Sequence, residues 1–560
     1  MELKNMLLWA ALAFILLLIY QQWEADYGSQ SPTQVSQTQS TSAAQNQGIP
    51  EPAKDAPAAP ETRGDTPAQI VEDSLQSRQR VHIHTDVLDI EIDTVGGDIR
   101  QALLPQYPVS VDKPDVPFRL MGEGEDTFIA QSGLVAPAKS NIQAPDHHAI
   151  YKTEKTEYEL GEGEDALEVV LSWTGDSGVK VDKVYRFERG SYQVDVRYEV
   201  TNTGTQPWQA YMYRQLQRSE VEMQTGLGML PVYTGAVYSG FNKLQDEAVS
   251  YEKYDFGDME DRNLDTTLQG GWAAMIQHYF LVAMIPEQDE TNRFYSLKAD
   301  GDRYAIGMIE TQQHKLNAGE STQFGYEMFI GPKVQDLLKE VAPNLHLTVD
   351  YGFTTIIADP LFWLLDWIHG WVGNWGWAII IMTILIKAVF YRLQAKSFHS
   401  MAKMRKLNPR IQQLKERYGD NKQGFQQAMM ELWKKEKVNP FGGCLPILIQ
   451  MPIFIAFYWV LLESVELRQA DWILWYKDLS LKDPYFVLPI LNGISMYIQF
   501  KLNPAPTDPI QEKIMMFMPI FVSVLFLFFP AGLVLYWTVN GILQNIQQYF
   551  ITKEVEKAGH

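Results

Sequence analysis

One lysine stands alone in a long apolar stretch of this 560-residue chain. Lys387 is the single charged side chain in the run 375–391, which ends just before Arg392. A lone cation inside a membrane segment costs about 3 kcal/mol or more unless it reaches lipid headgroups or water. Arg392 is about 7.5 Å further along a helix, so the stem of Lys387 can extend to the membrane surface. Alternatively, Lys387 lines a wet pocket that attracts an acidic guest.

Uncharged polar side chains accompany Lys387 in the apolar stretches of the sequence. Thr383 lies one helical turn before Lys387 and shares its face. Such residues can simply hydrogen-bond one helix to another, at about 0.6 kcal/mol each. Because they gather toward the same end of the stretches as the cation, without a counter-acid, a hydrated and positively charged cavity is the other interpretation. The further residues predicted to line this groove are Gln450, Asn492, Gln499 and Asn540.

The sequence shows no pattern typical of an enzyme. Apart from Lys387, the apolar runs contain no Asp, Glu, His or Arg, whereas proton-coupled transport and intramembrane proteolysis usually need buried acids or histidines. Asp366 and His369 fall in a Trp-rich segment outside those runs. His147 and His148 lack zinc-ligand spacing, and no phosphate-cradling glycine loop occurs. We therefore expect no catalytic activity, metal or cofactor.

The apolar segments predict six membrane spans. Residues 1–23 are expected to be an N-terminal anchor, because Met6–Tyr20 contains no charge; a cleaved signal peptide is the alternative. Five further spans are expected to form the core of an α-helical polytopic bundle. Their predicted bounds are 371–392, 444–462, 485–500, 514–529 and 531–550.

Charge is divided unevenly along the chain and predicts the topology. Residues 24–350 carry 26 basic and 52 acidic side chains, whereas 351–560 carry 20 and 15. The connection 392–443 holds 12 basic and four acidic residues, so it is predicted to be cytoplasmic. The loop 463–484 holds three basic and five acidic residues and is predicted to lie outside the cytoplasm, whereas both termini are predicted to lie inside. The overall net charge of −21 argues against direct nucleic-acid specificity.

The acidic half is predicted to contain a tether and a β-domain. Residues 24–79 are rich in Ser, Gln, Thr, Ala and Pro and are predicted to be a disordered linker. Residues 80–332 alternate apolar and polar side chains between glycine turns, which predicts a large antiparallel β-sandwich. Segment 333–370 is expected to form interfacial helices, with ordinary domain-packing helices as the alternative for 333–342.

The basic connection is predicted to fold as a cytoplasmic helical hairpin, residues 393–437. Asn408-Pro409 is expected to interrupt its first helix, Gly419 to end it, and Asp420 with Gln423 to cap the second. Methionine suits adaptable binding surfaces, so the hairpin is a candidate recruitment site; a self-packed hairpin is the alternative. Its candidate residues are Met401, Met404, Arg405, Met429 and Met430. Residues 551–560 are expected to be a short cytoplasmic tail.

Six stretches of the helical half form a specific set of motifs: VGNWGWAIIIMTILIK (372–387), SMAKMRKLNPRIQ (400–412), KVNPFGGCLPILIQMPIFIAFY (437–458), ESVELRQA (463–470), DPYFVLPILNG (483–493) and FPAGLVLYW (529–537). Through these stretches the sequence resembles, across roughly 351–550, the YidC/Oxa/Alb family of membrane protein insertases in its Gram-negative YidC form.

The resemblance implies roles for particular residues. Lys387 stands where the family has a groove cation, most often arginine, and lysine keeps the charge without the bidentate fork. Thr383, Gln450 and Trp537 match groove-lining or substrate-touching positions. Arg392 replaces a proline that many relatives have. The family further implies a periplasmic β-supersandwich over 80–335, related to sugar-epimerase-like sandwiches, and an inner-membrane location.

The hypothesis favoured by these observations is a membrane protein insertase and chaperone. The polar translocated segment of a nascent membrane protein would enter the groove, drawn by Lys387, while its apolar segment enters the lipid. The resemblance implies the Sec translocon and its accessory subunits as partners, and the ribosome and signal-recognition machinery as contacts of the hairpin. The alternative is a polytopic transporter or channel with an exterior sensor domain, but no internal repeat supports it.

Overall fold

The computed structural model of the chain describes residues 77–137, 140–220, 233–243, 245–299, 302–419, 421–436, 445–503 and 509–557. The predicted N-terminal anchor and all but the last three residues of the predicted linker lie outside these ranges. The statements below concern the described residues.

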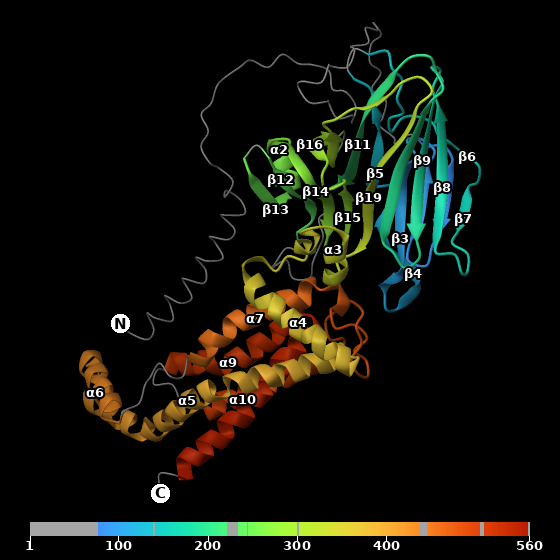
Figure 1. The fold of residues 1–560 in the computed structure, drawn as a ribbon. Helices are drawn as coiled ribbons and strands as arrows, with labels where there is room; N and C mark the ends of the chain where they lie inside the picture. The colour runs from blue at the N-terminus through green and yellow to red at the C-terminus, as the bar shows by residue number, and fades with distance from the viewer. Residues whose placement is uncertain are drawn as a thin grey trace. The chain divides into compact units, whose positions relative to one another are not determined.

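The acidic half forms a β-domain in which most neighbouring strands are antiparallel (Figure 1). The strands are β1 (Arg80–His84), β2 (Asp89–Asp93), β3 (Asp98–Ser110), β4 (Lys113–Met121), β5 (Phe128–Val135), β6 (Lys152–Thr153), β7 (Glu157–Glu159), β8 (Ala166–Thr174), β9 (Val179–Glu188), β10 (Gln193–Asn202), β11 (Trp208–Ser219), β12 (Gly235–Asn242), β13 (Glu247–Tyr254), β14 (Asp265–Gln277), β15 (Phe280–Ile285), β16 (Thr291–Ala299), β17 (Arg303–Glu310), β18 (His314–Leu316) and β19 (Ser321–Pro332).

Alternation along the strands places one face of each in the core. In β10, Val194, Val196 and Tyr198 are fully buried, whereas the intervening Asp195 and Arg197 are not. β10 pairs with β9 on one side and with β19 on the other, both antiparallel. β19 continues to β15, and β15 to β14. The predicted antiparallel β-sandwich is therefore found, with one parallel pair, β1 with β7, among the described strands.

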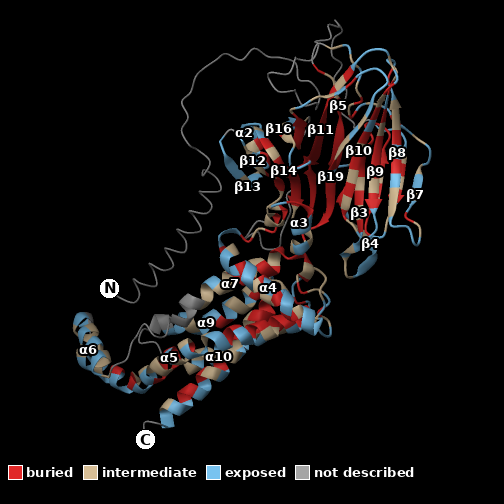
Figure 2. Ribbon diagram, in the orientation of Figure 1, coloured by how far each residue is buried: buried red, intermediate tan, exposed pale blue. Residues whose placement is uncertain are grey.

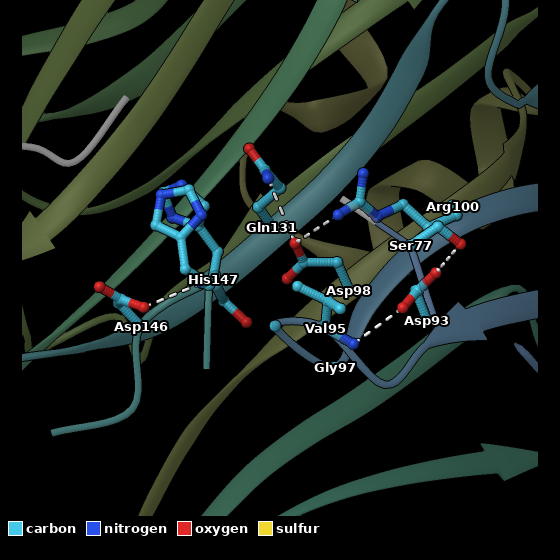
Figure 3. Close-up of polar contacts among 12 residues, drawn as sticks. Ser77, Asp93, Val95, Gly97, Asp98, Arg100, Gln131, Asp146 and His147 are labelled. Carbon is cyan, nitrogen blue, oxygen red and sulfur yellow. Dashed lines mark hydrogen bonds and ion pairs between the residues drawn. The ribbon is translucent and has the colours of Figure 1, made fainter. Parts of the chain in front are cut away.

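A buried polar cluster crosses the core of the β-domain (Figure 3). Asp98 is fully buried; one carboxylate oxygen accepts from Gln131 Nε2 at 3.2 Å and lies 3.6 Å from the Arg100 guanidinium. The other carboxylate oxygen lies 3.8 Å from the ammonium of Lys183. Lys183 also donates to the carbonyl of Ser132 at 3.1 Å. The charges of this cluster are paired, as interior charges usually are, although among the described residues Asp98 Oδ1 and Arg100 Nε receive no hydrogen-bond partner.

The basic half is helical. Its elements are α3 (Gln335–Val341), η1 (Leu345–Thr348), η2 (Gly352–Thr354), α4 (Thr355–Val372), α5 (Trp375–Tyr418), α6 (Lys422–Lys435), α7 (Leu445–Glu463), η4 (Val465–Leu467), α8 (Val487–Leu502), α9 (Pro509–Phe526) and α10 (Ala531–Lys557), and α2 (Phe256–Asp261) lies within the β-domain. α5 packs lengthwise against α10 (Figure 1). α8 packs against both α9 and α10.

The long helix α5 corrects two sequence predictions. It starts at the N-cap Asn374, whose side chain accepts from Trp377 N, and it continues through Pro409 to Gly419. The predicted break at Asn408-Pro409 is therefore wrong, and the second span and the first arm of the hairpin are one helix of 44 residues. Packing of Leu407 and Ile411 against α6 holds the helix on both sides of the proline.

Two helix ends also differ from the predictions. Asn421, not Asp420, caps α6, because its side chain accepts from Gly424 N; Asp420 itself lies outside the described residues. The last helix does not end at residue 550 but runs to Lys557. Its final turns pack on α5, where Ile551 meets Phe398 and Met401.

The six-span count is not confirmed. Within the described ranges, α5 is the one helix whose length and hydropathy suffice to cross a membrane, and α7 contributes the shorter apolar stretch Gln450–Glu463. α8, α9 and α10 nevertheless expose apolar side chains: Ile490, Phe517, Phe521 and Ile546 are each about half or more exposed. Figure 2 shows exposed positions along α9 and α10. Such surfaces are uncommon on soluble proteins.

Candidate functional site: a buried lysine between two helices

Lys387 is buried between α5 and α10, with 7% of its surface exposed. Its ammonium donates to Gln544 Oε1 of α10 at 3.1 Å and to Gln394 Oε1 of α5 at 3.5 Å. Both partners are neutral amides, and no carboxylate pairs with Lys387 in the part of the chain that the structure describes. A buried, uncompensated cation with a spare N–H is poised to attract a negatively charged group.

Thr383 and Asn540 are also buried, at 1% and 7% exposure. The Thr383 hydroxyl donates to the Ile379 carbonyl at 2.7 Å, within its own helix. The hydroxyl proton of Thr383 is therefore used within α5, and the lone pairs of the hydroxyl oxygen can accept a hydrogen bond.

The predicted groove residue Gln450 and a further amide, Asn545, join helices to one another. Gln450 Nε2 of α7 donates to the Tyr536 hydroxyl of α10 at 2.6 Å. Asn545 of α10 donates to the carbonyl and hydroxyl oxygens of Ser495 on α8, at 2.8 and 3.0 Å. Helix-to-helix bonding, the first interpretation above, thus accounts for these residues.

The same seam leaves acceptor oxygens without donors. The side-chain oxygens of Asn492, Asn545 and Gln548 are buried and have no hydrogen-bond partner among the residues that the structure describes. Asn492 is fully buried, and its Nδ2 reaches only the sulfur of Met496 at 3.6 Å. Buried polar atoms without protein partners are usually satisfied by ordered water, which favours hydration along α8 and α10.

Trp537 and Gln499 have different surroundings from Lys387. The Trp537 ring packs edge-on against Phe454 of α7 and Phe526 of α9, with centroids 4.4 and 5.8 Å apart. It therefore lies in an aromatic cluster at the junction of three helices. Gln499 is half-buried on α8.

The hairpin residues divide into an inner and an outer set. Met401 packs on Ile551 of α10, and Met404 and Met429 pack around Leu407. These three methionines face inward, as the self-packed alternative requires. Arg405 is exposed, and Met430 is 53% exposed. The ion pair Arg410–Glu436, at 2.7 Å, closes the hairpin.

Sequence reasoning missed Gln394, the second acceptor of Lys387. Its position seven residues after Lys387 puts it on the same helix face, so the spacing contained the signal. The importance of Gln544 depends on the packing of α5 against α10 and has no local signal.

Comparison with known proteins assigns the family. The family described as YidC periplasmic domain matches residues 80–364, and the family described as 60Kd inner membrane protein matches residues 367–558. The membrane protein insertase YidC of Thioalkalivibrio sulfidiphilus is 48% identical over 99% of this chain and 98% of its own length. The chain belongs to the YidC family of membrane protein insertases.

Other relatives agree. The membrane protein insertase YidC of Nitrosococcus oceani is 46% identical, with all of both chains covered. A solved YidC insertase structure covers 85% of this chain and 93% of its own, with 19% identity and a TM-score of 0.39. In YidC terms, the β-domain is the periplasmic domain of the family, and α5 to α10 lie in its inner membrane protein region.

Proposed function

We propose that this chain inserts nascent membrane proteins into the bacterial inner membrane and assists their folding. The observation that carries the proposal is Lys387: a cation buried between α5 and α10, bonded only to two neutral amides. Supporting it, the buried oxygens of Asn492 and Asn545 lack donors on the neighbouring helix seam. A buried positive charge beside acceptor oxygens that lack donors suits a polar, acidic segment in transit.

The order of events during insertion follows from the difference between the charged site around Lys387 and the apolar exposed faces of the helices. The translocated segment enters from the cytoplasmic side, and the polar groups that it brings avoid the cost of several kcal/mol each that hydrocarbon would impose. The apolar segment moves along the exposed faces of α8 and α9 into lipid, where Ile490 and Phe521 are exposed. Burial of the apolar segment drives the process, so the chain itself needs no catalytic group or cofactor.

The proposal includes orientation and partners. Both termini lie in the cytoplasm and the β-domain in the periplasm, as the charge of the loops predicts. The hairpin receives the nascent chain from the ribosome and the signal-recognition machinery, through exposed Arg405 and Met430. Multi-span clients are shared with the Sec translocon and its accessory subunits.

Charge reversal of the groove cation tests the proposal. In cells depleted of the endogenous insertase, Lys387→Glu is expected to reduce insertion of a client with an acidic translocated tail by about tenfold, equivalent to ~1.4 kcal/mol of lost attraction. A client with a neutral tail is expected to lose much less. Lys501→Glu makes the same charge change at an exposed position on α8 and serves as the control.

Equal insertion of the acidic-tailed client by Lys387→Glu and the unmodified chain would show that the cation does not draw the segment. The transporter alternative has its own measurement. Reconstituted vesicles that pass ions or small solutes, but do not insert clients, would replace insertion by transport as the function.

A further inference from the structure

A short segment after α7 makes contacts that insertion through the groove does not explain. Glu463, the last residue of α7, pairs with Lys333 at 3.2 Å, and their side chains are 6% and 2% exposed. Lys333 follows directly on the last strand of the β-domain, β19, and also donates to the Thr348 carbonyl at 3.2 Å. The pair therefore ties the end of the β-domain to the end of α7.

Arg468 makes a second, independent contact with the β-domain. Its guanidinium donates to the Pro108 carbonyl at 2.7 Å and lies 5.5 Å from the ring centroids of both Phe118 and Phe280. The two rings stack on each other at 4.4 Å. Gln469 donates to the same Pro108 carbonyl at 2.7 Å. A planar cation over aromatic rings, with hydrogen bonds at its edge, is a geometry that lysine does not reproduce.

The third contact is at the helix end itself. His278, in the turn between β14 and β15, bonds through Nε2 to the Leu462 carbonyl at 2.8 Å. A carbonyl only accepts, so Nε2 carries the proton. Carbonyls in the last turn of a helix have no partner within the helix, and His278 supplies one to α7.

We infer that residues 462–469, here called the α7 seat, are the surface on which the β-domain docks to hold the outer end of α7, and that Lys333, Glu463 and Arg468 are positioning residues for insertion. This inference rests on the proposed function. α7 connects the seat to α10, the helix that carries Gln544, the partner of Lys387. Gln450 and Phe454 lie 13 and nine residues before Glu463 and contact Tyr536 and Trp537 of α10. The distance along the helix is roughly 20 Å, so a loosened seat lets α7 tilt away from α10.

The test distinguishes the loss of one charge, which leaves its partner unpaired, from the loss of the whole Lys333–Glu463 ion pair. Lys333→Met leaves Glu463 buried without a partner, which is costly, whereas Lys333→Met with Glu463→Gln removes both charges, a change that interiors usually tolerate. In the full chain reconstituted in lipid, amide exchange of residues 463–469 is expected to rise about tenfold in the single variant and to return to within about twofold in the double variant. Insertion of the acidic-tailed client is expected to follow the same order, slowed about threefold and then restored.

Three further variants keep the test decisive. Lys298→Met breaks an exposed ion pair with Glu260 on the β-domain and serves as the control, with no expected effect on either measurement. Arg468→Ala probes the second contact, and Arg468→Lys, which keeps the charge without the fork, is expected to recover only part of the protection. These variants test the seat even where Lys333→Met fails to fold.

Unchanged exchange of 463–469 in both Lys333→Met and Arg468→Ala would overturn the seat. Faster exchange with full insertion activity would overturn the positioning role. If the unmodified chain inserts no client, the proposed function fails, while the exchange data still decide whether the seat exists.

Discussion

Two buried lysines of this chain, Lys183 and Lys387, differ in the partners that stabilise their charge. Lys183, in the β-domain, donates to two carbonyls, lies 3.8 Å from the Asp98 carboxylate and is flanked by the rings of Tyr185 and Tyr198. Burial lowers the pKa of Lys183 to about 8, and Asp98 opposes that shift. Among the described residues, Lys387 has two partners, the amide oxygens of Gln394 and Gln544. Lys183 thus has charged and polar partners in the core, whereas the partners of Lys387 are both neutral.

A buried histidine predicts how the stability of the β-domain depends on pH. Burial lowers the pKa of His147 to about 3, helped by the neighbouring His148, Arg100 and Lys183. Because the unfolded chain takes up a proton near pH 6.5 and the native one does not, stability is fully present above that pH and is lost as pH falls toward 3. We expect a loss of about 3 kcal/mol between pH 7 and 4, since that window extends about 2.5 units below the pKa of the unfolded chain, at about 1.36 kcal/mol per unit.

The measurement is thermal unfolding of the full chain between pH 7 and 4. His147→Asn, which cannot titrate, is expected to flatten the profile, whereas His82→Asn, at a partly exposed strand position, is expected to leave it unchanged. A parallel fall in the His147→Asn variant would assign the pH dependence to other groups.

Among the helices, contact surfaces rather than local sequence determine where elements end and how closely they approach. α5 continues through Pro409 because α6 packs on both sides of it, and α10 continues to Lys557 because Ile551 packs on α5. Lys406 of α5 also donates to the Val555 carbonyl at 2.6 Å and so caps the last turn of α10. The base of the cytoplasmic hairpin is thus formed by α5 together with the end of α10.

A glycine at the start of α5 marks a close approach that can be tested. A methyl group on Gly376 would overlap the side chain of Trp472, in the loop 463–484. Because a bulky indole cannot move aside cheaply, Gly376→Ala is expected to destabilise the chain by about 1–3 kcal/mol. Thermal unfolding in detergent measures this change.

The same substitution at Gly370 is the matched control. Gly370 lies in α4 and has open space around it, so Gly370→Ala is expected to be neutral or to stabilise by up to about 1 kcal/mol through helix propensity. Equal effects at Gly370 and Gly376 would show that propensity, not packing against Trp472, dominates.

At the scale of the whole molecule, the exposed apolar face of α4 indicates where lipid meets protein. Ile356 is 88% exposed, Trp371 78% and Trp363 67%. Indole rings favour the interface between headgroups and acyl chains. We propose that α4 lies on the outer membrane surface, between the β-domain and the start of α5.

Depth measurements test this placement. In a Cys444→Ser background, a spin label at Trp363→Cys is expected to contact lipid-soluble oxygen more than a water-soluble relaxation agent, and a label at Glu199→Cys on β10 the reverse. Equal access of the aqueous agent at both positions would place α4 in water.

Patterns with a short period were predictable from the chain itself. Alternation of apolar and polar side chains within residues 80–332 predicted strands with one buried face, and β10 has that burial pattern. The lone Lys387 identified a polar site within an apolar helix, and Gly419 correctly marked where α5 ends. These features depend on the side-chain period of one element and need no knowledge of its neighbours.

Tertiary packing decided what those features contact. Gln544 meets Lys387 across 157 positions of sequence, and Glu463 meets Lys333 across 130. Met404 and Met429 turned inward because α6 folds back on α5 and buries them. The spacing of apolar residues shows which face of a helix or strand is apolar. Which other element packs on that face depends on shape and burial across the whole molecule. The residues that satisfy a buried charge are therefore known only once the helices and strands are packed.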